Sequence, residues 1–336
     1  MRRRRRKYIS LWFALVLALL LCGGIFYVTS MPGKSWSGAL PPLTAEQVWL
    51  SDRLKKHITV LSEEIGERNL WRDGTLDTTA GYIEETFQAM GYTVSSQVFT
   101  VEGAHVRNLE AVLEGTSLAK EIVLIGAHYD TVKGSPGAND NASGVAALLE
   151  IARLLVAKPL ARSVRFVAFV NEEMPFFSTQ AMGSHRYAQR AHEHGDNISA
   201  MLSLETIGYY SDTKGSQQYP NPFYAWLYPD TGNFIGFVGN LASRKLVRQC
   251  LGSFRRHSAF PSEGVAAPGR MAGIYWSDHW SFWNEGYSAV MVTDTAFFRY
   301  PHYHDSTDMP DKIDYGRLAR VVTGLAQVTA DLSQAQ

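Results

Sequence analysis

Cysteine is almost absent from this chain of 336 residues, which contains only Cys22 and Cys250. Because Cys22 falls inside an apolar run near the N-terminus, the rest of the chain holds a single cysteine and cannot form an internal disulfide. A small disulfide-stabilised fold and a metal knot built from thiolates are therefore both excluded. A chain of this length must rely on a hydrophobic core for its stability.

Net charge is also lacking, since the 32 basic and 32 acidic residues balance each other. Six of the positive charges lie in the stretch from Arg2 to Lys7, so residues 8–336 carry a formal net charge of −6. A mildly acidic body argues against nucleic acid as a partner, because nucleic-acid binding depends on positive charge.

Charged residues are missing altogether from residues 8–28, which are mostly apolar and number about 20, enough to cross a bilayer. The basic residues 1–7 in front are expected to stay in the cytoplasm. We therefore predict an uncleaved transmembrane signal anchor, with the remainder of the chain periplasmic or extracellular. A cleaved signal peptide is the alternative, because Val28–Ser30 loosely fits a cleavage site. Residues 29–44 are rich in Pro, Gly and Ser and predict a flexible linker.

Residues 45–336 alternate segments typical of strands and helices. This order predicts one α/β domain, a mostly parallel mixed central sheet sandwiched between helices, preceded by the single N-terminal transmembrane helix. Residues 209–232 lack periodicity and predict a long surface loop or lid. Strands are expected at 93–101, 107–113, 122–127, 163–170, 200–204, 234–238 and 289–293, and helices at 45–67, 77–90, 142–156, 177–191, 241–254, 281–285 and 315–332.

Metal-binding residue types follow three of these strands at the point where each strand ends. In α/β sheets this edge is where ligands bind. Several carboxylates crowded there would repel one another unless a cation joined them. Their nitrogen and oxygen donors suit a pair of divalent ions, for which zinc is the simplest choice. The predicted ligands are His128, Asp140, Glu173, Glu205 and, from late in the chain, His304.

A general base is expected beside these ligands. Glu172 precedes a predicted ligand, and its side chain points the other way along an extended chain. It is therefore placed to accept a proton from a water molecule at the site.

These motifs together resemble the co-catalytic two-zinc aminopeptidases, a metallopeptidase family that also includes glutaminyl cyclases, glutamate carboxypeptidases and transferrin-receptor ectodomains. The resemblance covers about residues 45–333, and the motifs occur in the family's order. The segments that carry it are His128–Asp130, Gly137–Gly144, Asn171–Glu173, Glu205 and Tyr303–His304.

The resemblance implies a role for each predicted ligand. Asp140 would bridge two zinc ions. His128 and Glu205 would complete the site of one ion, and Glu173 and His304 would complete the other.

It also implies roles for the residues around the ligands. Glu172 would be the general base, and Asp130 would orient His128. Tyr303 would help to stabilise the oxyanion. The Asp140–Asn141 peptide bond would be cis.

Two features depart from the family pattern. Many relatives have aspartate where Glu205 stands, which makes the ligand geometry at that position uncertain. The chain also inserts Met174–Gln180 after the glutamate pair, so the pocket wall cannot be transferred from relatives.

The function implied is that of a hydrolase, a membrane-anchored, zinc-dependent exopeptidase. An aminopeptidase is favoured, hydrolysing N-terminal peptide bonds with a metal-bridging hydroxide and Glu172 as general base. The alternatives are a glutaminyl-cyclase-like acyltransferase with one zinc, and a non-catalytic ectodomain that binds a partner. The sequence leaves open the side-chain preference, a carboxypeptidase activity, the native metal and the oligomeric state.

Some residues have competing interpretations. His302 could replace His304 as a ligand. Ser277, Asp278 and His279 suggest a serine triad, but sequence neighbours rarely form one, and a supporting role near the metals is preferred. Most members of an aromatic set are expected in the core and the others in an apolar substrate pocket. The set is Phe176, Phe177, Trp276, Trp280, Trp283, Phe297 and Phe298.

Overall fold

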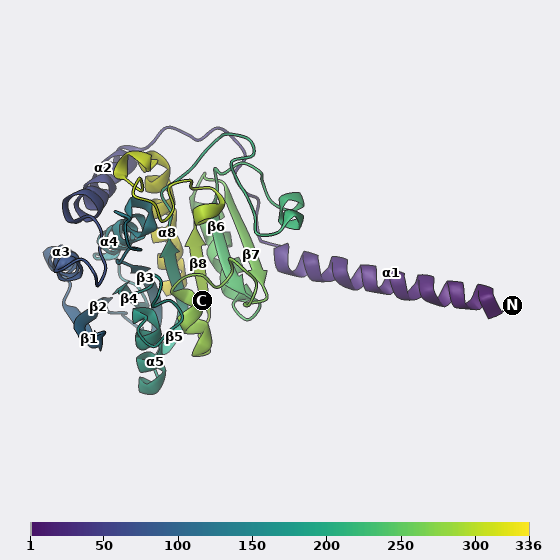
Figure 1. The fold of residues 1–336 in the computed structure, drawn as a ribbon, viewed down its shortest axis with the longest axis horizontal. Coiled ribbons are helices and arrows are strands. Elements are labelled where there is room, and N and C mark those ends of the chain that lie inside the picture. Colours follow the sequence, from purple (N-terminus) through teal and green to yellow (C-terminus); the bar gives the residue numbers. More distant parts are fainter. Residues whose placement is uncertain (1, 336) are drawn as a thin grey trace.

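The computed structural model describes residues 2–335, apart from the side chains of residues 2–11, 13, 14, 21 and 223. Figure 1 shows an α/β domain from which the first helix, α1 (Arg2–Thr29), projects by itself. The arrangement confirms the predicted α/β fold with a mixed central sheet.

The domain is built on one eight-stranded sheet with the order β1-β2-β4-β3-β5-β8-β6-β7. Its centre is parallel, because β3 pairs in parallel with β4 and β5, and β5 with β8. At one edge β1 pairs antiparallel with β2, and near the other edge β6 runs antiparallel to β8. The strands are β1 (Val94–Val101), β2 (Ala104–Leu113), β3 (Leu118–His128), β4 (Arg162–Phe169), β5 (Asn197–Glu205), β6 (Ile235–Asn240), β7 (Ser262–Ala267) and β8 (Ala289–Thr293).

Helices cover both faces of this sheet. One layer packs around α4 and α8 and includes α2, α3 and α6, whereas α5 and α7 lie on the other face. The helices are α2 (Ala45–Thr59), α3 (Thr75–Ala89), α4 (Gly144–Leu155), α5 (Gly183–His194), α6 (Arg244–His257), α7 (His279–Asn284) and α8 (Tyr315–Ser333).

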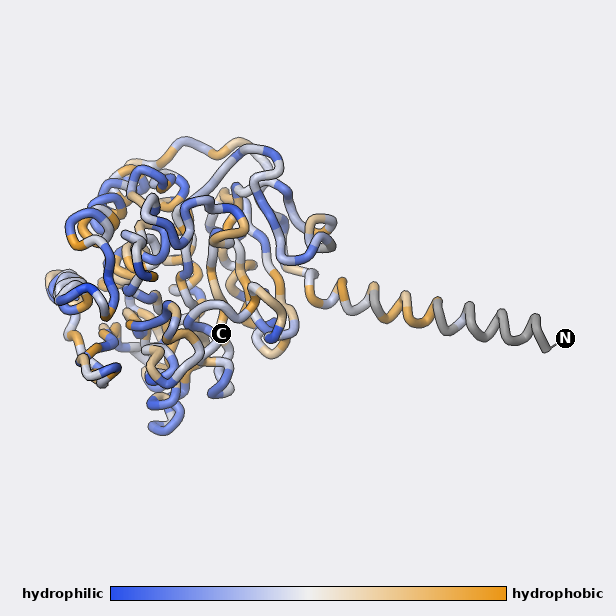
Figure 2. The backbone as a smooth tube through the Cα atoms, in the orientation of Figure 1, coloured by the Kyte–Doolittle hydropathy of each residue, from blue (hydrophilic) through white to orange (hydrophobic). Residues whose placement is uncertain are grey.

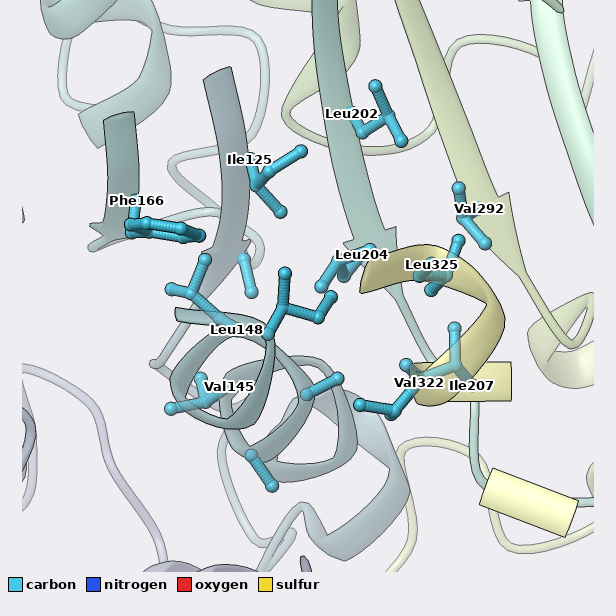
Figure 3. Close-up of a cluster of buried hydrophobic side chains, with 14 of the residues drawn as sticks. Ile125, Val145, Leu148, Phe166, Leu202, Leu204, Ile207, Val292, Val322 and Leu325 are labelled. Atoms are coloured by element: carbon cyan, nitrogen blue, oxygen red, sulfur yellow. The ribbon is translucent and has the colours of Figure 1, made fainter. Parts of the chain in front are cut away.

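The central strand β3 is apolar on both faces because both faces are covered. Val123 and Ile125 belong to the core under α4 and α8, and Ile122 and Leu124 belong to a second core under α5 and α7. Figure 3 shows Ile125 facing the side chains of α4 and α8. This packing fixes the end of β3, and with it His128, at the edge of the sheet.

The helix expected at 45–67 is divided into α2 and a π-helix, Val60–Ile65. Two further elements differ from the sequence prediction. Strand β7 was not predicted, because its sequence SEGVAA consists mainly of small residues without a strong apolar pattern. Helix α5 starts at Gly183 instead of residue 177, because residues 174–182 form turns after the cis peptide bond Met174–Pro175.

The expected flexible linker, residues 29–44, instead lies against the domain. The hydroxyl oxygen of Ser35 accepts a hydrogen bond from the backbone of Ser262 on the edge strand β7 at 2.9 Å. Arg255 of α6 donates to the carbonyl of Pro32 at 3.0 Å, and Arg320 of α8 donates to the carbonyl of Pro41. These side chains and backbone groups hold the segment in place.

Among the residues whose side chains the structure describes, no helix is long and apolar enough to cross a membrane. The structure therefore gives no support to the transmembrane helix predicted at residues 8–28. Part of that range, including residues 8–11, lies outside the described side chains. The described part of α1 that adjoins the domain is mostly hydrophobic in Figure 2.

Candidate active site

The site lies where the parallel strands end. His128 is the last residue of β3 and Glu205 is the last residue of β5. Glu172 and Glu173 follow β4 after Asn171, whose φ of 60° turns the chain out of the sheet. Because β4, β3 and β5 are parallel neighbours, these side chains meet at one edge.

His128, Asp140 and Glu205 form one group of potential metal ligands, with their donor atoms within 4.8 Å of one another. The Nε2 atom of His128 lies 3.4 Å from Oδ1 of Asp140 and 3.3 Å from Oε2 of Glu205. All three residues are buried.

Asp140, Glu173 and His304 form a second group of the same size. The Nε2 atom of His304 lies 3.1 Å from Oδ2 of Asp140 and 3.2 Å from Oε2 of Glu173. The two histidines therefore face different oxygens of one carboxylate, that of Asp140. The structure thus brings all five predicted ligands together, with Asp140 between the two groups.

The donor set fits divalent cations. Nε2 of His128 and Oδ2 of Asp140 are buried and have no hydrogen-bond partner among the described residues, although charged groups lie close to both. Burial raises the pKa of Glu173 to about 7 with help from the charge of Asp140. A cation bound here would contact the buried imidazole nitrogen, which otherwise has no partner. It would also offset the repulsion between the neighbouring carboxylates.

The two histidines carry strongly shifted pKa values. Burial would lower the pKa of His128, but the charges of Glu205 and Glu172 raise it well above its ordinary value. Burial likewise opposes protonation of His304, whereas the neighbouring carboxylates of Asp140 and Glu173 raise its pKa to about 10. The cluster therefore attracts positive charge strongly.

Asp130 lies behind His128 and also accepts hydrogen bonds from the turn that carries the glutamate pair. The Nδ1 atom of His128 lies 3.2 Å from the carbonyl oxygen of Asp130 and 3.5 Å from its carboxylate. The same carboxylate accepts the backbone N–H groups of Glu172 and Glu173, each at 3.1 Å. Asp130 thus joins the end of β3 to the turn that carries the glutamate pair.

The loop that carries Asp140 is held from the C-terminal part of the chain. The carboxylate of Asp308 accepts the backbone N–H groups of Asn139 at 2.8 Å and Asp140 at 3.1 Å. The peptide bond between Asp140 and Asn141 is cis, which confirms that prediction. The side chain of Asn141 bridges to the end of β5 by donating to the carbonyl of Leu204 at 2.8 Å.

Glu172 is buried beside the cluster, with Oε2 at 3.9 Å from Nε2 of His128. Burial raises the pKa of Glu172 well above its ordinary value, and the positive charge of His128 opposes this shift. Tyr303 stacks on His304 with ring centroids 3.9 Å apart. Burial and the nearby carboxylate of Asp140 raise the pKa of Tyr303 well above its ordinary value, so its hydroxyl stays protonated.

The competing interpretations do not fit the geometry. His302 bonds to Thr307 through Nδ1 at 2.7 Å and belongs to neither ligand group. Ser277 donates to Glu205 at 2.8 Å, and His279 bonds to the carbonyl of Ile274 at 2.7 Å. Ser277 and His279 thus bond elsewhere and do not form a serine triad. Ser277 instead supports a predicted ligand.

A mainly apolar cavity of about 130 Å³ opens beside the cluster. Glu205 and Tyr303 stand at the end nearest the cluster. Of the seven aromatic residues considered from the sequence, Trp276, Phe297 and Phe298 line this cavity. Its other aromatic residues come mainly from the segment expected to form a lid, residues 209–232.

Comparisons with known proteins agree with this geometry. Residues 108–329 match the model of peptidase family M28. The chain is 35% identical over 327 residues to the uncharacterized protein YfbL of Escherichia coli, covering 95% of this chain and 97% of that one. The chain belongs to peptidase family M28.

Two further similarities are to proteins that are named as aminopeptidases. Aminopeptidase YwaD of Bacillus subtilis is 38% identical over 163 residues, which cover 47% of this chain and 32% of the relative. The structure of BSAP, a zinc aminopeptidase from Bacillus subtilis, matches the fold with a TM-score of 0.68 at 15% identity, covering 84% of this chain and 95% of that one. The resemblance drawn from the sequence is confirmed, and the M28 chain is a metallopeptidase.

Arg68 is a component of this M28 site that the sequence did not reveal. Its guanidinium is fully buried and forms no ion pair within the described part of the chain. It donates instead to backbone carbonyls on both sides of the loop between His128 and Asp140. The acceptors are Leu61, Gly66, Tyr129, Pro136 and Gly137.

Proposed function

We propose that this M28 metallopeptidase is a zinc-dependent aminopeptidase. The observation that carries the proposal is the sharing of Asp140 between two groups of donor atoms, with Glu172 beside them and an apolar cavity adjoining. The names of YwaD and BSAP support removal of residues from the amino end of a peptide.

Two zinc ions would be held by the predicted ligands, one by His128, Asp140 and Glu205 and the other by Asp140, Glu173 and His304. Bound at this position, such ions supply Lewis acidity that polarises the scissile carbonyl and makes water easier to deprotonate. Asp130 holds His128 in orientation through Nδ1, which leaves Nε2 directed at the cluster.

Glu172 is the proposed general base. It accepts a proton from the attacking water and then donates that proton to the departing amine. Burial favours the protonated form of Glu172, which suits the second half of this task, and a cation held by His128 and Glu205 would favour the ionised form required for the first half.

Tyr303 is proposed to donate a hydrogen bond to the oxygen that becomes negative in the transition state. Its raised pKa keeps the proton on the hydroxyl at neutral pH. Its stacking on His304 holds the ring beside the cluster before the substrate arrives.

We also propose that α1 associates with a membrane and keeps the domain outside the cytoplasm. Supporting observations are the basic N-terminal stretch and the exposed apolar side chains of α1, among them Leu15, Leu19 and Phe26. Alkaline carbonate extraction of cells tests this proposal. Release of the full-length chain by carbonate would contradict it.

The peptidase proposal is tested with the purified full chain, a peptide with a free amino end and the same peptide acetylated. We expect two zinc ions per chain, sequential release of N-terminal residues, no cleavage of the acetylated peptide and loss of activity with a chelator. Glu172→Gln should retain zinc and lose about 10²–10⁴-fold in kcat. Full activity of this variant would refute the mechanism.

The same assay separates the alternatives. Trimming from the carboxyl end would replace the aminopeptidase with a carboxypeptidase. Conversion of N-terminal glutamine to pyroglutamate with one zinc would indicate a cyclase. A folded chain without affinity for zinc would indicate a non-catalytic binding role.

A further inference from the structure

The cavity beside the cluster has a floor built from one row of the sheet. Glu205 on β5 pairs with Thr293 on β8, Thr293 pairs with Gly236 on β6, and Gly236 pairs with Glu263 on β7. All four residues line the cavity. The row therefore runs across four strands, from a proposed zinc ligand to a second carboxylate at the sheet edge.

The strand spacing gives the length of this row. Neighbouring strands lie about 4.8 Å apart, so three steps separate the backbones of Glu205 and Glu263 by about 14 Å. Gly236 in the middle has no side chain, and a Cβ atom placed there would meet only Thr293, at 3.3 Å. The missing side chain leaves the floor open along its length.

The walls are aromatic. Tyr219, Tyr224 and Tyr228 lie with ring centroids 6.1 to 6.4 Å apart. The hydroxyl of Tyr228 donates to the carbonyl of Gly264 on β7 at 3.0 Å, which fixes this wall against the edge strand. The ring faces suit the apolar stem of a long side chain and, near its end, a cationic group.

Glu263 stands at the end of the floor farthest from Glu205, and its carboxylate can accept further hydrogen bonds. Its side chain is 22% exposed, and the nearest guanidinium nitrogen, Nη2 of Arg255, is 3.7 Å away. Arg255 gives its hydrogen bonds to other oxygens, among them the carbonyls of Ser262 and Pro32. Burial raises the pKa of Glu263, which Arg255 and Ser35 oppose, so a further cation would help to hold its negative charge.

We propose that this cavity binds the side chain of the substrate's N-terminal residue and that Glu263 selects a basic one, lysine or arginine. The assignment rests on the proposed aminopeptidase function. An alanine or leucine side chain would end over the middle of the row, whereas the long stems of lysine and arginine bring a cation toward Glu263. Thus Glu263 determines specificity and takes no part in bond cleavage.

The experiment compares kcat/KM for 4-nitroanilides of lysine, norleucine, arginine, leucine and alanine with the zinc-loaded full chain. Lysine and norleucine have similar stems and differ in charge. We expect the wild-type enzyme to prefer lysine to norleucine by about tenfold or more. Glu263→Gln should reduce kcat/KM for lysine and arginine by about 10- to 100-fold and change norleucine, leucine and alanine less than about threefold.

Two further variants keep the test decisive. Glu85→Gln, on the exposed surface of α3, is the matched control and should leave every ratio unchanged. Gly236→Val places methyl groups on the open floor. It should reduce kcat/KM for lysine, arginine and norleucine together and spare alanine.

The outcomes separate this inference from the function it rests on. An enzyme that cleaves leucine and alanine anilides but shows no preference for lysine over norleucine would overturn the inference alone. Equal losses for lysine and norleucine in Glu263→Gln would also overturn it. Failure of the zinc-loaded wild-type chain to cleave any anilide or unblocked peptide would overturn the aminopeptidase function and this assignment together.

Discussion

The carboxylate of Asp130 accepts the backbone N–H of Glu172 at 3.1 Å, although 42 residues separate them. Asp130→Asn replaces one accepting oxygen with a donor, so one buried backbone N–H loses its partner. We expect kcat/KM and zinc affinity each to fall about 10- to 100-fold. Steady-state kinetics and competition with a chromophoric chelator measure both quantities.

Asp212→Asn is the control for this change, because Asp212 is 67% exposed and pairs with Arg317 at the surface. It should retain wild-type kinetics and zinc affinity. Wild-type behaviour of Asp130→Asn would show that the two backbone contacts do not position the glutamate pair.

Arg68→Lys tests the guanidinium that spans the loop between His128 and Asp140. Lysine has fewer donors and no planar fork, so several buried carbonyls lose their partners. We expect a loss of about 2–4 kcal/mol in the free energy of unfolding, measured by urea denaturation, together with weaker zinc binding. The control is Arg72→Lys, whose side chain is 62% exposed. Equal stability of the two variants would contradict this role.

The five predicted ligands meet in the structure, and three of them, His128, Glu173 and Glu205, could be picked out because they follow strongly apolar runs. The run from Ile122 to Ala127 indicated a buried strand, and this placed His128 at the sheet edge. The acids after β4 and β5 followed by the same argument. Charged residues directly after a buried strand leave a clear pattern along the chain.

Arg68 and β7 left no such pattern. The five acceptors of Arg68 are backbone carbonyls, which every residue type provides, so nothing in the sequence marks its contacts. Strand β7 is held by pairing with β6 and by the segment around Ser35, and its small residues alone do not predict a strand. Both features arise from tertiary contacts.

The row from Glu205 to Glu263 could not be predicted from the sequence for a related reason. Its members come from four strands, and their alignment depends on the strand order and register. With β7 unpredicted, Glu263 had no assigned position. The predicted lid, residues 209–232, could be recognised only as a long segment without periodicity.

Glu150→Gln tests a buried ionic cluster that includes none of the predicted metal ligands. Glu150 is fully buried and accepts hydrogen bonds from Arg53 at 2.8 Å and Arg153 at 2.6 Å, and His57 lies 3.1 Å away. Glutamine cannot satisfy all of these partners. We expect a loss of about 1–3 kcal/mol in the free energy of unfolding. Glu84→Gln, in a partly exposed pair with Arg107, should cost less than about 1 kcal/mol.

The contribution of Glu150 should depend on pH. Burial would raise the pKa of Glu150, but hydrogen bonds from His57 and Arg153 lower it overall. Because the pKa of Glu150 is lower in the folded chain than in the unfolded chain, its ionised form stabilises the fold at pH values above the unfolded pKa of about 4.3. This stabilisation is lost as the pH falls through the pKa of Glu150 in the folded chain. The stability difference between wild type and Glu150→Gln should therefore shrink below about pH 4. A constant difference across this range would contradict the assignment.

Glu205→Asp introduces the aspartate that the family resemblance led us to expect at this position, and it should nevertheless impair this chain. Oε2 of Glu205 lies 3.3 Å from Nε2 of His128 and accepts a hydrogen bond from Ser277 at 2.8 Å. Aspartate is one methylene shorter and cannot keep both contacts without movement of β5, whose end is fixed by pairing with β3 and β8. We expect zinc affinity and kcat/KM to fall about 10- to 100-fold. Ser277→Ala should produce a smaller loss of the same kind. Ser203→Ala removes a hydroxyl that is hydrogen-bonded to Ser277, and its loss should be smaller still. Zinc affinity equal to that of the wild type would contradict this prediction. It would mean that the end of β5 can move far enough for the shorter aspartate side chain to bind the metal.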